Sequence, residues 1–444
     1  MDQHHFLLVS LPFQSHINPT LRLATKLTRA GARVSFATTV NGLNNLKTRP
    51  PLPAVSYDSF SDGNEAQANA TFGQPPSFQQ IELIGSISLK NLLLSKAKQG
   101  QKVDFLIYGM CLPWVAKVAR ELHLPSAFFF FQSAASFSVV VYQFFKGDGG
   151  MVNSDIDPNG LLQIPGLPLL RYDEIPDQFL RPTDALFPVF REHIETLEKD
   201  PNPCILINTF DGLEEESIRS IRDRINIFSV GPLVPGETED SDRETYLRWL
   251  DSKPAKSVIY VSFGSIAKLG KKQQEEILEG LIESGHPFLW VIRNHGEDDE
   301  AAKSYRASTV AEDDGLIVRW CSQVEVLNHF AIGCFVSHCG WNSISESMVG
   351  GVAMVGCPQF ADQKMNIKMV EEVWGNGVKA VADGGGEGVV GREEIKRCLK
   401  VAMESEEIKR NCERLKAMAM EAVADGGSSD TNLKRLFESL NCIS

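Results

Sequence analysis

The chain has 444 residues, of which 43% are hydrophobic and 23% are charged, and this composition is typical of a globular protein with two domains. The formal net charge of -13 argues against a general surface for nucleic acids or anionic membranes. The nine cysteines include no CxxC pair, so we expect reduced thiols and a cytoplasmic location.

Apolar strand-like runs alternate with amphipathic helices in the first part of the chain. The expected strands are 6–12, 32–39, 103–109 and 126–131. One expected helix opens at Asn18-Pro19, and another covers 114–122. The first run has no basic lead and no small-residue cleavage site, so we expect a strand there rather than a signal peptide. Apolar strands separated by helices predict a parallel sheet covered on both faces.

The uncharged segment 126–145 is close to the length that spans a membrane. Gln132, Gln143 and four serines interrupt it, however, and no basic flank orients it. We therefore expect a buried strand followed by a buried helix, and no stable membrane insertion.

The pattern breaks and restarts near the middle of the chain. The acidic, turn-rich segment 236–242 predicts an exposed linker. The strands expected after it are 257–265, 287–293, 315–321, 334–338 and 353–358, and the helices are 271–285, 392–424 and 429–440. We predict an α/β protein with domains at 1–235 and 251–428, a linker at 236–250, and a C-terminal helix in 429–444 that packs back on the first domain. Ligands of such sheets bind in the crevice at the carboxyl ends of the strands.

The stretch FVSHCGWNSISES, residues 335–347, concentrates chemically versatile side chains at a strand end. Adjacent His338 and Cys339 do not fit the paired spacing of a metal site. A nucleophilic Cys339 at a helix N-terminus is a second reading, but it requires a base that the sequence does not identify.

An anion-binding helix start is the reading that this stretch favours. Gly340 allows a tight turn, and Asn342 or Ser343 lies near the cap of the next helix, where free N–H groups bind phosphate. His338 and the Ser343 hydroxyl add donors. Glu346, one turn further, can accept hydrogen bonds from a ribose diol.

These residues lie within a longer resemblance. Residues 320–363 resemble the 44-residue signature of plant UDP-sugar-dependent glycosyltransferases, and LPFQSHINPTLRLATKL, VSFGS and GGSSDTNLKRL match that family too. FSDG and IYGMCLPW are most similar to the branch that acts on flavonoids, anthocyanins, apocarotenoids and plant carboxylic acids. The resemblance implies the GT-B fold, in which two Rossmann-like domains face each other across a crevice, with the acceptor on the first domain and the UDP-sugar on the second.

The resemblance also implies roles for individual residues at the donor. Trp320 would stack on uracil beside Gln323, Glu346 would hold the ribose, and the backbone of Cys321 would read the base edge. Asp362 and Gln363 would bind the sugar hydroxyls. The donor-binding set so implied is Ser265, Trp320, Cys321, Gln323, His338, Trp341, Asn342, Ser343, Glu346, Asp362 and Gln363.

The implied reaction is inverting, metal-independent transfer of glucose from UDP-glucose to a hydroxyl or carboxyl group of a small plant metabolite. UDP-glucose is then a co-substrate, and we expect no cofactor, no metal, no nucleic-acid partner and a monomer. His16, at the end of the first strand, is the implied general base, since an unperturbed histidine titrates near neutral pH.

The sequence departs from the family at Gly109, where many members have an aspartate that orients the histidine. Asp104 cannot replace that aspartate, because five strand residues span about 16 Å and place it on the opposite face. A carboxylic acid or an acidic phenol needs little help from a base. We therefore hypothesise that the acceptor is a group of this kind.

An apolar, flat acceptor fits a chain with 25 Phe and 7 Tyr, although many of these rings can equally be core. The candidate acceptor-binding residues are Phe13, Met110, Cys111, Phe137, Phe179, Phe187 and Phe360, with Phe131 and Phe190 nearby. Two other functions compete. One is a nicotinamide oxidoreductase, which requires a G-x-G-x-x-G motif after the first strand, where this chain has SLPFQSHINP without a glycine. The other is a weakly active or inactive UDP-sugar-binding protein.

Overall fold

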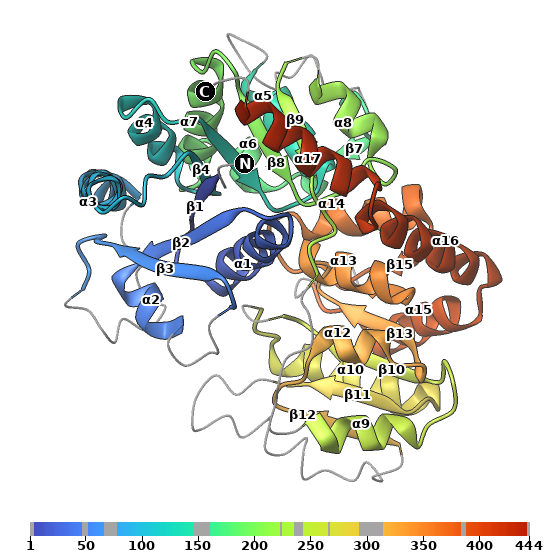
Figure 1. Cartoon of the computed structure of the whole chain (residues 1–444). Coiled ribbons are helices and arrows are strands. Elements are labelled where there is room, and N and C mark those ends of the chain that lie inside the picture. The colour runs from blue at the N-terminus through green and yellow to red at the C-terminus, as the bar shows by residue number, and fades with distance from the viewer. Residues whose placement is uncertain are drawn as a thin grey trace.

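Two parallel β-sheets, each covered by helices, form the framework of the molecule (Figure 1). The computed structural model describes residues 4–46, 52–65, 78–145, 160–222, 224–234, 243–264, 267–292, 314–382 and 388–441. The first sheet has the order β3-β2-β1-β4-β5-β8-β9 and the second the order β12-β11-β10-β13-β14-β15, and all their strand pairs are parallel. The predicted α/β architecture with two Rossmann-like units is confirmed.

The strands are short, and most of their residues are buried except in the edge strands β3 and β12. Those of the first sheet are β1 (His5–Val9), β2 (Arg33–Thr39), β3 (Val55–Phe60), β4 (Phe105–Gly109), β5 (Ser126–Phe130), β8 (Cys204–Ile207) and β9 (Asn226–Ser229). Those of the second are β10 (Val258–Ser262), β11 (Phe288–Val291), β12 (Gly315–Val318), β13 (Ile332–Ser337), β14 (Ala353–Gly356) and β15 (Gly377–Lys379). An antiparallel pair, β6 (Leu161–Leu162) and β7 (Leu170–Arg171), stands apart from both sheets.

Helices connect the strands and cover the sheets. In the first half these are α1 (Gln14–Arg29), α2 (Val40–Leu46), α3 (Phe78–Lys98), α4 (Pro113–Glu121), α5 (Ala134–Phe144), η2 (Tyr172–Glu174), α6 (Asp177–Leu180), α7 (Phe187–Glu198) and α8 (Glu215–Arg222). In the second they are α9 (Arg243–Asp251), α10 (Lys271–Ser284), α12 (Gln323–Asn328), α13 (Trp341–Gly350), α14 (Gln363–Lys368), η3 (Met369–Trp374), α15 (Arg392–Glu404), α16 (Glu406–Val423) and α17 (Ser428–Asn441).

Two predicted helices differ from the observed ones. The first helix begins at Gln14 rather than Asn18, because the Phe13 carbonyl accepts hydrogen bonds from the N–H groups of His16 (2.9 Å) and Ile17 (2.8 Å). The single helix expected at 392–424 is broken at Ser405, whose hydroxyl accepts the N–H of Ile408 and caps a new helix.

The strand and helix predicted at 126–145 are confirmed as β5 and α5. Within the described ranges, none of the helices combines the length and the apolar character that a membrane span requires.

The strand order places two loops at the centre of each sheet. In the first sheet the order reverses between β1 and β4, and in the second between β10 and β13. The crevice beyond the carboxyl ends of the strands at such a reversal is where open α/β sheets bind ligands. The loops that follow these four strands are therefore the best-placed positions for a site.

The two halves of the molecule contact each other through several side chains. The Trp341 indole donates to the Asn208 carbonyl (2.7 Å), and the Trp374 indole donates to the Leu213 carbonyl (3.3 Å). A buried ion pair joins Lys368 to Glu174 at 3.2 Å. These contacts fix α13 and α14 against the first half.

Helix α17 returns from the second half and packs on β9 of the first sheet. The Asn432 amide donates to the Ser229 carbonyl at 3.2 Å, and the ring of Phe437 lies 5.2 Å from that of Phe6. Residues 236–242 of the predicted linker lie outside the described residues, and residues 243–250 belong to α9, so the bounds of the linker stay a prediction.

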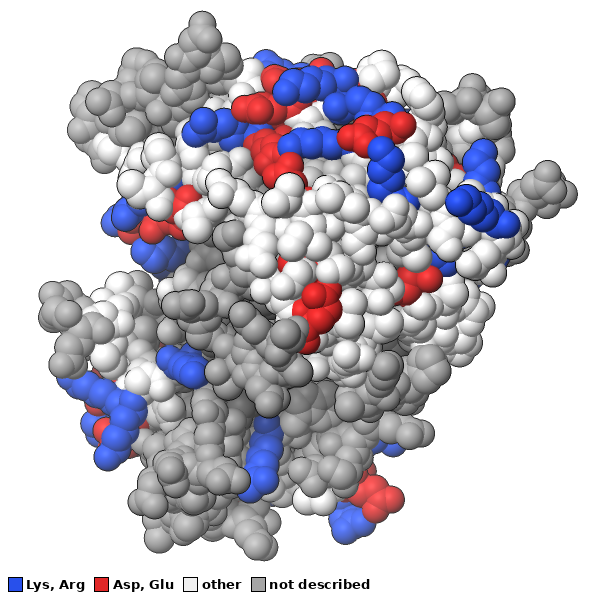
Figure 2. Space-filling view, turned by 90° about the vertical axis from the view of Figure 1, so that its left-hand side faces the viewer, with Lys and Arg blue, Asp and Glu red and all other residues white. Residues whose placement is uncertain are grey.

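Charged side chains on one outer face alternate in sign. Figure 2 shows Lys and Arg interleaved with Asp and Glu on the side that carries α3 and α4. Lys90 pairs with Glu121 (2.8 Å), and Lys117 pairs with Glu82 (2.8 Å) and Glu192. Such a mixed surface offers no single-sign field to a polyanion.

Candidate active site

His16 lies in the first turn of α1, just after β1, at the reversal point of the first sheet. Its ring packs against Phe131 at 4.9 Å and Phe13 at 5.7 Å between centroids. Nδ1 is buried and has no hydrogen-bond partner among the described residues. Loss of solvation lowers the pKa of His16 to about 4, so the imidazole is neutral at pH 7.

Gly109 ends β4, the strand beside β1, and leaves space near this histidine. A Cβ built on Gly109 would lie 3.7 Å from the Val9 carbonyl and 3.8 Å from Cε1 of Phe131, which are ordinary contacts. Asp104 lies at the other end of the strand pair, where its carboxylate accepts the N–H of His5 at 2.9 Å. The prediction that Asp104 is too far away to orient His16 is confirmed.

His338 follows β13 at the reversal point of the second sheet, and two glycine turns enclose its ring. A Cβ on Gly264, whose φ is 73°, would lie 2.8 Å from Cε1 of His338, and one on Gly340 would lie 2.7 Å from Nε2. Side chains at either glycine would displace the imidazole. Burial lowers the pKa of His338 to about 4, so the ring is a neutral N–H donor rather than a cation.

Helix α13 starts beside this histidine with Gly340 as its N-cap, so its first N–H groups are free to bind an anion. Asn342 Oδ1 is buried there with no partner in the described part of the chain. Cys339 is fully buried, and burial raises the pKa of its thiol well above the usual range. A thiol held protonated in this way argues against the nucleophilic alternative.

The ten-residue helix α13 also carries Glu346, which belongs to a buried polar cluster. The Gln323 amide donates to Oε2 of Glu346 at 2.7 Å and to the Ser343 hydroxyl at 3.1 Å. The Tyr260 hydroxyl donates to Gln323 at 3.3 Å and lies 3.4 Å from the Cys321 sulfur. The structure therefore brings four of the predicted donor residues together.

Trp320 stands next to this cluster with 38% of its surface exposed. An exposed indole beside buried acceptors provides a flat face for a nucleobase. Trp341 differs, because its indole is buried against Trp374 at 5.9 Å and donates to Asn208 in the first half. Its side chain joins the two halves, and its backbone N–H is what remains for an anion. Ser265 lies outside the described residues.

Asp362 and Gln363 precede and begin α14. Burial raises the pKa of Asp362 to about 6, although the Asn366 amide donates to its carboxylate at 2.7 Å. Gln363 Oε1 accepts the N–H groups of Gln359 (2.8 Å) and Phe360 (3.1 Å). Phe360 itself is 45% exposed and so presents an accessible ring beside both polar side chains.

The predicted acceptor residues divide into two groups. Met110 and Cys111 follow β4 at the reversal point, and Phe13 is partly exposed beside His16. The members of the other group pack on aromatic rings: Phe137 on Phe130 (5.0 Å between centroids), Phe179 on Phe190 (4.9 Å), and Phe187 on Phe144 (5.0 Å). Phe137 and Phe179 have no exposed surface, and Phe187 (5%), Met110 (5%) and Cys111 (7%) have little, so burial alone does not separate the two groups and these acceptor assignments stay predictions.

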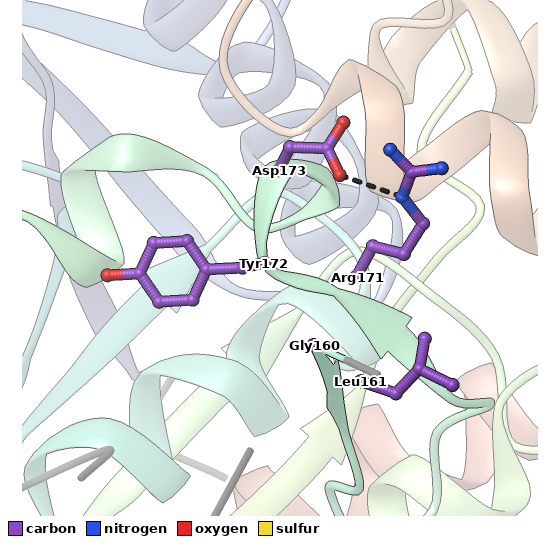
Figure 3. Close-up of a pocket in the computed structure, with 5 residues that line it drawn as sticks. All are labelled: Gly160, Leu161, Arg171, Tyr172 and Asp173. Carbon is purple, nitrogen blue, oxygen red and sulfur yellow. Dashed lines mark hydrogen bonds and ion pairs between the residues drawn. The ribbon is translucent and has the colours of Figure 1, made fainter. Parts of the chain in front are cut away.

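Sequence reasoning missed two features. A surface pocket of about 510 Å³ is lined by Gly160, Leu161, Arg171, Tyr172 and Asp173, and Figure 3 shows Tyr172 directed away from the Arg171–Asp173 pair. Lys364 of α14 lies 3.9 Å from Asp173, so the pocket borders the second half. The other feature is Arg22, whose guanidinium contacts Glu346 at 3.0 Å. The two residues are 324 positions apart, and no local pattern links them.

The sequence of this chain is similar to those of known glucosyltransferases. Residues 226–422 match the family model described as UDP-glucoronosyl and UDP-glucosyl transferase. The crocetin glucosyltransferase of Gardenia jasminoides is 38% identical over 99% of this chain and 98% of its own length. The phloretin 4'-O-glucosyltransferase of Malus domestica is 39% identical over 100% of this chain and 99% of its own length.

Solved structures show the same fold. Os79 from O. sativa, in complex with U2F and trichothecene, has a TM-score of 0.84 and 32% identity over 99% of this chain and 100% of that chain. UGT2 of Phytolacca americana, complexed with UDP-2fluoro-glucose and pterostilbene, also has a TM-score of 0.84, with 26% identity over the same shares of the two chains.

Proposed function

The chain belongs to the family of UDP-glucoronosyl and UDP-glucosyl transferases, and from this premise we propose that it transfers glucose from UDP-glucose to a small plant metabolite. The transfer is inverting and independent of metal, and the acceptor group is a hydroxyl or a carboxyl. The observation that carries the proposal is the pair of histidines at the two sheet reversals, one of them held by glycine turns at an anion-binding helix start.

The donor lies along the second sheet. Trp320 stacks on the uracil, with Gln323 and the backbone of Cys321 beside it, and Glu346 accepts hydrogen bonds from the ribose. The diphosphate lies at the start of α13, where the backbone N–H groups, the Ser343 hydroxyl and His338 donate to it. Ser265, which lies outside the described residues, and the backbone at Trp341 and Asn342 complete the set. Asp362 and Gln363 bind the hydroxyls of glucose.

Departure of UDP places extra negative charge on the diphosphate. Fixed N–H dipoles that already point at this position stabilise the charge without reorganising as it develops. The neutral His338 ring adds a donor without changing its own charge. Among the described residues, no group of three or more His, Cys, Asp or Glu side chains is arranged to hold a metal ion.

His16 accepts the acceptor's proton through Nε2, since Nδ1 is buried. A pKa of about 4 makes this imidazole a weak base at neutral pH. A carboxylate needs no deprotonation at pH 7, and an acidic phenol needs little. We therefore propose a carboxylic acid or an acidic phenol as the acceptor, held between Phe13, Met110, Cys111 and Phe360.

A second candidate is an inactive UDP-sugar-binding protein of the same fold, which the unpartnered Nδ1 of His16 favours. In either case we propose a monomer in the cytoplasm, with UDP-glucose as co-substrate and no cofactor.

Incubation with UDP-glucose and a panel of carboxylates, phenols and aliphatic alcohols, read by mass spectrometry, separates these functions. We expect carboxylates or acidic phenols to gain one hexose, with a β linkage by NMR, and we expect His16→Ala to lower transfer to phenols more than transfer to carboxylates. Stabilisation by UDP without any hexose transfer would point to the inactive protein. Preferential turnover of aliphatic alcohols would rule out the proposed acceptor class.

A further inference from the structure

Arg22 of α1 and Glu346 of α13 form a buried ion pair across the two halves of the molecule. We propose that Arg22 is a positioning residue that holds Glu346 in place to accept the ribose hydroxyls of the nucleotide. The inference rests on the proposed function, because it requires a UDP-sugar in the second half. It makes recognition of the donor's ribose depend on a residue of the acceptor half.

The contacts of Arg22 lead to this role. One guanidinium nitrogen, Nη2, lies 3.0 Å from Glu346 Oε1, and Nη1 donates to the Leu233 carbonyl at 3.0 Å. The side chains of Arg22 and Glu346 are only 15% and 5% exposed. Helices α1 and α13 face each other near the middle of the molecule (Figure 1), so the guanidinium bridges the halves with its fork.

The carboxylate of Glu346 is held at both oxygens by different halves. Oε2 accepts the Gln323 amide at 2.7 Å from within the second half, whereas Oε1 accepts Arg22 from the first. A carboxylate oxygen has two lone pairs, so each still has one free for a ribose hydroxyl. The orientation of these free lone pairs is therefore set by Arg22 and Gln323 together.

A buried carboxylate without a cation is costly, but a buried ion pair adds little net stability compared with apolar residues of similar size. Geometry is the better explanation for keeping one at this position. The guanidinium is a rigid planar donor, and it fixes an acceptor more closely than a flexible ammonium does.

Lys26 offers a matched control one turn further along α1. Its ammonium donates to the Val230 carbonyl at 2.9 Å, so it anchors the same segment, residues 230–233, that Arg22 contacts at Leu233. Replacing Lys26 by Met removes a cation and a contact with that segment without touching Glu346. Any general effect of loosening the segment would appear in both variants.

The test compares UDP with 2'-deoxyuridine 5'-diphosphate by calorimetric titration into the full-length protein. For the wild type we expect the ribonucleotide to bind about tenfold or more tightly, the usual effect of a hydrogen bond to a charged group. Arg22→Met should weaken UDP binding by a similar factor and leave binding of the deoxynucleotide nearly unchanged. The ratio of the two affinities should then be close to one. Lys26→Met should keep the wild-type ratio. In steady state, Arg22→Met should raise KM for UDP-glucose with little change in kcat.

A double-variant cycle gives a second readout. In a Glu346→Gln background, Arg22→Met should change UDP affinity by less than about twofold, because the partner it positions is already neutralised. If Arg22→Met does not fold, Arg22→Gln, which keeps a donor but no charge, takes its place with the same expected loss of the ratio.

The outcomes separate this inference from the proposed function. Suppose that the wild type binds UDP more tightly than the deoxynucleotide. If the Arg22 variants then bind both nucleotides more weakly by the same factor, or keep the wild-type ratio of affinities, the role of Arg22 is overturned. A wild type that binds UDP and the deoxynucleotide equally overturns both the Arg22 role and the ribose role of Glu346, but not glucosyl transfer. A wild type that binds no UDP overturns the proposed function itself.

Discussion

The space beside His16 at Gly109 leads to a specific prediction. Gly109→Asp would supply the carboxylate that this histidine lacks. The Cβ fits, because its nearest neighbours would be the Val9 carbonyl at 3.7 Å and Phe131 at 3.8 Å, and Phe131 is the ring that packs on His16. The variant should strengthen His16 as a base.

The magnitude follows from Coulomb's law. A carboxylate about 4 Å from the imidazolium, at an effective dielectric constant of about 20, interacts by about 4 kcal/mol, or about three pKa units. The cost of burying the new carboxylate offsets part of this, so we expect the pKa of His16 to rise from about 4 to between about 6 and 7.

The assay has two parts. NMR titration of the His16 ring protons gives the pKa directly, and initial rates on aliphatic alcohols report the stronger base. A positioned base typically contributes about a hundredfold or more, so aliphatic alcohol turnover should rise by that order while carboxylate turnover changes little. Gly109→Asn, which has the same shape without the charge, is the matched control.

Two results would refute this reasoning. One is a His16 pKa that is the same in the Asp and Asn variants. The other is a wild-type protein that already turns over aliphatic alcohols as fast as carboxylates, since its histidine would then need no partner.

Three further outcomes test the site and its electrostatics. Gly264→Ala should weaken UDP binding by about tenfold or more in calorimetry, because its Cβ would lie 2.8 Å from the His338 ring. The control is Gly285→Ala, where φ is a similar 69° and a Cβ would meet nothing within 4 Å. This control should lower only the stability seen in thermal unfolding and leave UDP binding unchanged. The neutral His16 contributes stability that is present above pH 6.5 and is lost as pH falls towards about 4. The free energy of unfolding in urea should therefore decrease between pH 7 and pH 4.5, and His16→Gln should make this decrease smaller by at most about 3 kcal/mol. The same pH dependence in the variant and the wild type would contradict this. Asp362 should lose its sugar-accepting charge as pH falls through about 6, so KM for UDP-glucose should rise there. Asp362→Asn should abolish the rise, and a rise that persists in this variant would point to another group.

Local patterns in the sequence account for most of the framework. Helix α10 ends where Gly285 adopts a left-handed φ of 69°, and the apolar runs at β10 and β13 lie where they were expected. The break at Ser405 has a recognisable signal too, since a serine followed by two glutamates is a typical helix start.

Other features depend on contacts that no local pattern encodes. Aromatic content cannot separate a pocket from the core: Phe137 and Phe179, which are predicted acceptor residues, are fully buried, and Met110 and Cys111 are nearly so. The sequence identifies Trp341 as part of the signature, but only the packing of the two halves shows that its indole donates to Asn208. The pairing of Arg22 with Glu346 is likewise a product of the assembled fold.

The most direct test of the account is calorimetric titration of UDP into the wild type and into a variant that combines His338→Ala with Glu346→Gln. We predict one UDP bound per wild-type chain. The affinity should be at least about a hundredfold lower in a folded double variant, because two contacts with the nucleotide are lost. A wild type without measurable affinity for UDP, or a double variant that binds UDP as tightly as the wild type, would contradict the assignment of this site.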